Sequence, residues 1–149
     1  MIPTTPRRIE FEELISVLVA EHAEMKEDLV DIKRLVSKRD FSSASKTLVH
    51  LDRVFRQHIA DEEAQVLRLL IGAYGVKGAD EAIIIFRQHR PIYQLVEEVK
   101  KLASLPPEEL ALDETKLRRM LEEHTNAEEN HIFPKAVSTY KEKGGKLNI

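Results

Sequence analysis

The sequence predicts an all-α protein built as an antiparallel, up-down-up-down bundle of four helices. Apolar residues recur at steps of three, four or seven along four long segments, as they do on one face of a helix. Glycine-rich and proline-rich breaks separate these segments, and no stretch has the pattern of a strand. Four amphipathic helices with short connections pack most simply with their apolar stripes facing one another. A single long coiled coil is the alternative architecture, but the breaks favour a chain that folds back.

The first two helices are predicted at about residues 10–37 and 41–71. The first apolar stripe consists of Phe11, Leu14, Leu18, Met25, Leu29, Ile32 and Val36, and His22 fills a gap in it. The second consists of Leu48, Leu51, Phe55, Val66 and Leu69, with His58 and Glu62 at the stripe positions between them. We expect the second helix to end near Gly72, because the following GAYGVKGAD is typical of a turn.

The last two helices are predicted at about residues 80–103 and 113–142. The third stripe consists of Ile85, Ile92, Val96, Val99 and Leu102 and includes His89, before Leu105, Pro106 and Pro107 end the helix. The fourth consists of Leu117, Leu121 and Ile132, with His124 and Glu128 on the same face. Pro91 should kink or restart the third helix, and Pro134 should bend the fourth.

Composition limits the possible functions. The 149 residues suit one domain, and a formal net charge of -3 gives no basic surface for nucleic acid. Cysteine is absent, so any metal is held by nitrogen and oxygen ligands. The longest apolar run near the start is too short to cross a bilayer, so we expect a cytoplasmic protein without a membrane partner. The oligomeric state is left open.

The helical stripes carry a repeated pair of metal-ligand residues. His58-x-x-x-Glu62 and His124-x-x-x-Glu128 each place an imidazole and a carboxylate one helical turn apart on a core-facing stripe. His22 and His89 add one inward imidazole from each remaining helix, and all four histidines lie roughly at mid-helix. Burying these groups without a partner is costly. We therefore predict two metal ions, preferably iron, with manganese or zinc as alternatives.

The order His, His-x-x-x-Glu, His, His-x-x-x-Glu on four successive helices resembles the hemerythrin-like, or HHE cation-binding, family. The string HTNAEENHIFPKA, from His124 to Ala136, is similar to the final segment of that family. The resemblance implies a hemerythrin-like bundle and a non-haem di-iron centre that meets oxygen, nitric oxide or peroxide. It also implies a role in oxygen binding, iron homeostasis or the stress response. The expected partner is therefore a small diatomic ligand or peroxide.

One position departs from the oxygen-carrying hemerythrins, which place two histidines four residues apart on the third helix. Here Ile85 and Tyr93 flank His89 at that spacing. The resemblance then implies that one iron has one nitrogen fewer, with room for a small ligand or for an approach by Tyr93. Stable oxygen carriage is accordingly not expected.

Several alternatives remain open at this stage. Glu128-x-x-His131 also fits the Glu-x-x-His element of ferritin-like bundles, but no second copy occurs, which favours an outer role for His131. Glu63 and Glu129 directly follow the ligand carboxylates, so we expect them to face solvent or to pair with Lys and Arg. His50 is expected at a solvated rim without a function. A di-iron oxidase or peroxidase-like enzyme and a metal-free helical interaction module are the competing functions.

Overall fold

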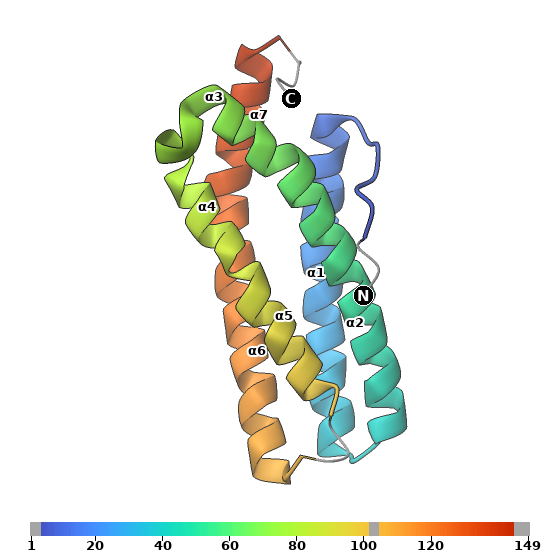
Figure 1. The fold of residues 1–149 in the computed structure, drawn as a ribbon. Helices are drawn as coiled ribbons and strands as arrows, with labels where there is room; N and C mark the ends of the chain where they lie inside the picture. The colour runs from blue at the N-terminus through green and yellow to red at the C-terminus, as the bar shows by residue number, and fades with distance from the viewer. Residues whose placement is uncertain (1–3, 102–104, 145–149) are drawn as a thin grey trace.

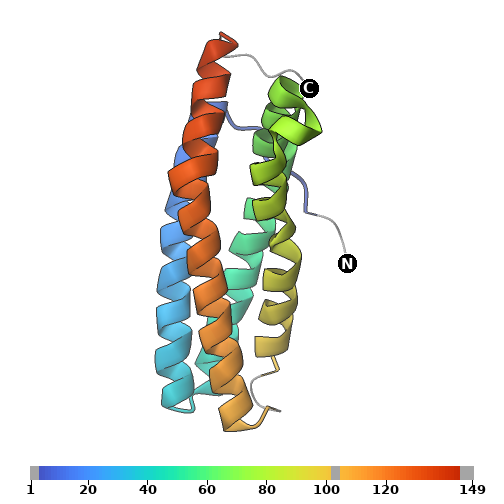
Figure 2. The same cartoon turned by 90° about the vertical axis from the view of Figure 1, so that its left-hand side faces the viewer.

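The structure is a computed structural model that describes residues 4–101 and 105–144. Within these ranges every regular element is a helix and no strand occurs, which confirms the all-α prediction. The helices run side by side as four long columns (Figures 1 and 2). None of the helices in these ranges is long and apolar enough to cross a membrane.

The first column is the single helix α1, Phe11–Ser37, and its bounds agree closely with the prediction. Its start is capped by the Glu10 carboxylate, which accepts a hydrogen bond from the Glu13 backbone N–H at 3.0 Å. A tight turn follows, in which Arg39 adopts a left-handed conformation with φ +58°. Asp40 then caps the next helix by accepting from the Ser43 backbone N–H at 3.2 Å. The short turn holds the first two columns next to each other.

The second column consists of α2, Phe41–Asp61, the π-helical segment η1, Glu62–Leu67, and α3, Arg68–Gly78. The prediction that it ends near Gly72 is wrong. Helical structure continues to Gly78 and is interrupted at Gly75, whose φ of +75° lies in the region that favours glycine. One glycine therefore makes the break that we expected of the whole glycine-rich stretch.

The third column consists of α4, Asp80–Arg87, and α5, His89–Val99. The predicted restart is confirmed, because Pro91 lies in the first turn of α5, where its missing N–H is not needed. The expected end at residue 103 and the stripe residue Leu102 fall at 102–104, outside the described residues. The restart places His89 at the start of α5.

The fourth column consists of α6, Pro107–Ala127, the π-helical segment η2, Glu128–Ile132, and α7, Phe133–Glu142. It begins at Pro107 and not near residue 113, because proline is well suited to the first helical position and Glu108 follows it in the first turn. Pro134 lies in the first turn of α7, directly after η2. The irregularity expected from Pro134 therefore takes the form of a π-helical segment.

Two apolar clusters fill the interior and leave a polar layer between them. Along its own column, each predicted histidine lies between members of one cluster and members of the other. His22, for example, lies between Leu18 of one cluster and Met25 of the other. His58 likewise lies between Phe55 and Val66. The predicted metal-ligand residues therefore share one level of the molecule, with apolar packing on either side.

Candidate metal centre

The six predicted residues come together as two buried groups that share both carboxylates. Within each group, one donor atom from every residue lies within 4.8 Å of the others. The first group consists of His22, His58, Glu62 and Glu128, and the second of Glu62, His89, His124 and Glu128. Each group therefore offers two imidazoles and two carboxylates, contributed by three of the four columns.

Each shared carboxylate points one oxygen at each group. Glu62 Oε2 lies 3.1 Å from His58 Nε2, and its Oε1 lies 3.0 Å from His89 Nε2. Glu128 Oε1 lies 2.9 Å from His22 Nε2, and its Oε2 lies 3.4 Å from His124 Nε2. Both carboxylates therefore have the arrangement that would let each bridge two neighbouring cations.

The Nδ1 atoms of the first group are held by two outer carboxylates. His22 Nδ1 lies 2.8 Å from Glu129 Oε2, and His58 Nδ1 lies 3.1 Å from Glu21 Oε1. A carboxylate only accepts hydrogen bonds, so each Nδ1 carries the proton and donates it. The Nε2 atom of each ring then turns its lone pair toward the centre, as a metal ligand must.

The second group repeats this arrangement with one difference. His89 Nδ1 donates to Glu63 Oε1 at 3.2 Å, and His124 Nδ1 donates to the side-chain oxygen of Gln88 at 2.9 Å. Three of the four imidazoles are thus held by a carboxylate and one by a neutral amide. The outer surroundings of the second group carry less negative charge than those of the first.

These outer acceptors form a closed ring around the four columns. Each acceptor comes directly before or after one of the six predicted residues in its own column and accepts a hydrogen bond from the histidine of the next column. Glu21 of α1 holds His58, and Glu63 of η1 holds His89. Gln88 then holds His124, and Glu129 of η2 returns to His22. Sequence reasoning missed the ring, although the polar neighbour beside each ligand residue was the available signal.

The prediction that Glu63 and Glu129 face solvent or pair with Lys and Arg is confirmed only in part, because both stay partly exposed but each pairs with a histidine. A residue next to an inward one is turned by about 100° around the helix. That rotation brings it to the flank that faces the neighbouring column, where the far nitrogen of a histidine is within reach. The side chains remain partly exposed, at 51% for Glu63 and 33% for Glu129.

Charge in the centre favours a bound cation. Burial lowers the pKa of the His58 imidazole, but the surrounding carboxylates, led by Glu62, raise it well above its usual value. Burial likewise opposes the rise of the His89 pKa to about 9, which hydrogen bonds to Glu62 and Glu63 cause. Burial raises the pKa of Glu128, yet its polar neighbours hold that pKa well below its usual value. The carboxylates around His58 and His89, and the polar neighbours around Glu128, therefore outweigh desolvation.

The donor set fits a metal ion. Among the described residues, six buried side-chain atoms have no hydrogen-bond partner, and three of them, Glu62 Oε2, Glu128 Oε2 and His124 Nε2, belong to the two groups. Buried polar atoms without partners are rare and costly. All three point into the two groups, where a cation would satisfy them. Imidazole and carboxylate ligands are suited to iron, and also to manganese or zinc.

Residues 3–70 match the family model described as Hemerythrin HHE cation binding domain. The resemblance to hemerythrin-like proteins is confirmed. The matched residues include His22, His58 and Glu62, whereas His89, His124 and Glu128 come after them. No curated protein and no solved structure matches the chain.

Three residues considered beside the hemerythrin-like pattern lie outside both groups. The Tyr93 hydroxyl accepts a hydrogen bond from Arg56 Nη2 at 2.6 Å, and the guanidinium also covers the Tyr93 ring. Ile85 packs against an apolar cluster, and His131 is exposed. The absence of a second histidine beside His89 does not make one group poorer in nitrogen than the other. Each group has two imidazoles.

His50 makes contacts that the sequence did not indicate. Its Nδ1 lies 2.6 Å from Asp28 Oδ2, and its Nε2 lies 3.1 Å from Glu24 Oε1. Both acidic residues belong to α1, whereas His50 belongs to α2. The histidine therefore links the first two columns at a partly exposed position.

Proposed function

We propose that this protein is a non-haem di-iron protein, in which each buried group holds one ion. Manganese or zinc are the alternative metals. The observation that carries the proposal is the sharing of Glu62 and Glu128 between the two groups, with one oxygen of each directed at each group. A single ion would leave one oxygen of each buried carboxylate and one pair of imidazoles unused. We also propose that residues 1–149 form one hemerythrin-like domain, arranged as an antiparallel up-down-up-down bundle. The proposed location of the protein is the cytoplasm.

The proposed role is to bind, sense or detoxify oxygen, nitric oxide or peroxide, within iron homeostasis or the stress response. Iron supplies a redox-active, Lewis-acidic centre when bound. The chain contributes four donors to each group, which leaves room in the coordination sphere of iron for a small ligand. The ring of outer acceptors keeps the four imidazoles in one tautomer and orientation. Apolar clusters on both sides exclude bulk water from this layer.

Ligand titration tests the role. Protein loaded with ferrous iron without oxygen is titrated with nitric oxide, azide, oxygen and peroxide while optical absorption and electron paramagnetic resonance are recorded. We expect saturable spectral changes with nitric oxide. Zinc-loaded protein is the matched control, since zinc has no redox chemistry. Spectra that no ligand alters would contradict the proposed role while leaving the metal site intact.

The same experiment distinguishes the proposed role from that of the competing enzyme. A di-iron oxidase or peroxidase-like enzyme would consume oxygen or peroxide over many turnovers when an electron donor is supplied. A protein that only binds or senses the ligand reacts once per centre and then stops, whereas detoxification would also show repeated turnover. The metal-free interaction module is disfavoured by the buried donor atoms that have no partner, and it predicts purified protein without stoichiometric metal.

A further inference from the structure

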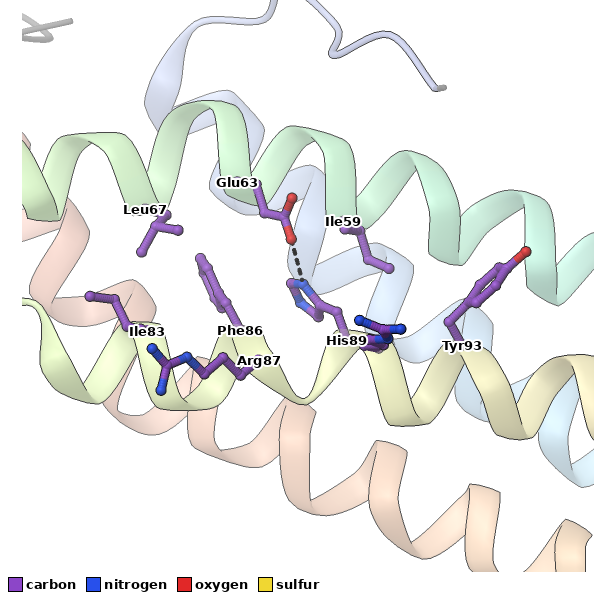
Figure 3. A pocket seen from close by; sticks show the side chains of 9 residues that line it. Ile59, Glu63, Leu67, Ile83, Phe86, Arg87, His89 and Tyr93 are labelled. Carbon is purple, nitrogen blue, oxygen red and sulfur yellow. Dashed lines mark hydrogen bonds and ion pairs between the residues drawn. The ribbon is translucent and has the colours of Figure 1, made fainter. Parts of the chain in front are cut away.

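A groove of about 500 Å³ runs along the outside of His89, between the second and third columns. Figure 3 shows its walls, which come from the end of α2 and η1 on one side and from α4 and α5 on the other. Apolar side chains line most of it, from Ile59, Leu67, Ile83 and Phe86. Its volume lies within the range of pockets that hold small organic molecules.

The groove borders the side of His89 that faces away from the buried centre. Glu63 and His89 face each other across it (Figure 3), with Glu63 Oε1 3.2 Å from His89 Nδ1. His89 Nε2 points the other way, 3.0 Å from Glu62 Oε1. A molecule in the groove would therefore contact the pair that orients His89 and would not contact the inward nitrogen.

Two arginines give the groove its charge. Arg87 and Arg90 both line it, and both are exposed. Neither side chain makes a hydrogen bond or an ion pair with any described residue. The one carboxylate that lines the groove, Glu63, is already engaged by His89. Two cationic groups beside an apolar wall are complementary to a molecule with an anionic head and an apolar tail.

We propose that this groove binds a small amphipathic anion, a carboxylate with an aliphatic chain. Its head pairs with Arg87 and Arg90, and its chain packs against Ile59, Leu67, Ile83 and Phe86. This site is separate from the proposed metal positions, and its existence does not depend on them. An occupant would lie against the Glu63–His89 pair, which would give an organic ligand a direct contact with the surroundings of the metal centre.

Calorimetric titration with decanoate tests the proposal on the purified full-length chain. We expect saturable binding of one decanoate per chain. Octanoate should bind about tenfold more weakly, because two buried CH₂ groups are lost. The double variant Arg87→Gln/Arg90→Gln should bind decanoate about three- to tenfold more weakly, because two partly exposed ion pairs are lost. Arg119→Gln removes an exposed arginine of α6 that does not line the groove, and this variant should bind like the parent.

Three results would overturn the proposal. The first is the absence of saturable binding below the concentration at which decanoate forms micelles. The second is a failure of charge recognition, seen either as equal binding of decylamine or as an equal effect of the Arg119→Gln control. The third is a dimer that persists with decanoate present but is lost in Ile83→Asp, which would assign the groove to a second copy of this chain.

Discussion

The Nε2 atoms of His22 and His58 face each other at 3.1 Å inside the buried centre. Each ring donates its Nδ1 proton outward, to Glu129 and Glu21 respectively. When both rings are neutral, two nitrogen lone pairs therefore point into the same space, and a proton or a metal cation between them removes their repulsion. The outer carboxylates create this arrangement, so they should control how tightly the centre holds a metal.

Neutralising one outer carboxylate should weaken metal binding at the first group. Glu129→Gln keeps an oxygen that can accept from His22 but removes its charge. We expect the metal affinity of that group to fall about 10- to 100-fold, as for other outer-sphere changes. Gln88→Glu makes the opposite change beside His124 and should tighten the second group. Competition with a chromophoric chelator measures both, and Glu122→Gln, at an exposed position on α6, is the control. Equal affinities in Glu129→Gln and Glu122→Gln would refute the outer-sphere role.

Removing a shared carboxylate should have a larger effect on metal content. Glu62→Ala or Glu128→Ala removes one donor from each group, so at least one ion per chain should be lost. Glu122→Ala should retain the parent content, because its side chain is exposed and away from both groups. Elemental analysis of natively purified variants gives the answer, with helical circular dichroism to verify folding. Full metal content in Glu62→Ala would mean that the carboxylates do not hold the ions.

Much of this centre was predictable from the sequence because each helix repeats its inward face at regular steps. The spacing His58-x-x-x-Glu62 and its second copy identified four of the six residues, and the apolar stripes identified His22 and His89. The two π-helical segments were not predictable, although η1 begins at Glu62 and η2 begins at Glu128. Such segments add a residue to a turn and often accompany functional sites, and no composition marks them.

The outer ring was missed for a different reason. Its contacts join residues of different columns, and a single sequence reports only the neighbours within one helix. Helical phase placed Glu63 and Glu129 off the inward stripe, which was correct, but it could not show that a histidine of the adjacent column lies beside each of them. The helix bounds failed at Gly72 and at residue 113 because glycine and proline favour breaks without fixing where these occur.

His131 distinguishes the present arrangement from a ferritin-like one. It follows Glu128 by three residues but is exposed and belongs to neither group. His131→Ala should therefore retain the parent metal content and the parent metal affinity. Elemental analysis together with the chelator competition measures both quantities. Loss of one ion in this variant would support the Glu-x-x-His alternative.

His50 should give a small pH-dependent stabilisation. Its hydrogen bond to Asp28 raises the pKa of the imidazole, burial and Arg53 oppose that rise, and the charge of Glu24 adds to it. Because the folded-state pKa is raised, this stabilisation is fully present below the unfolded value of about 6.5 and is lost as the pH rises through the folded value. The side chain is 43% exposed, so the contribution stays within about 1 kcal/mol.

Urea denaturation of the parent and of His50→Gln measures this effect. The difference in unfolding free energy between the two proteins should be larger at about pH 5.5 than at about pH 8.5. Taking the difference removes the contributions that the metal-ligand residues make to both proteins. An equal difference at the two pH values would show that the charge of His50 does not stabilise the contact between α1 and α2.

Counting the metal ions shows whether the two buried groups hold two ions. Natively purified protein is analysed for iron, manganese and zinc, and metal-free protein is then titrated with ferrous iron without oxygen. Because Glu62 and Glu128 serve both groups, we predict two ions per chain, with iron preferred. One ion per chain at saturation, or none, would contradict the shared-carboxylate centre.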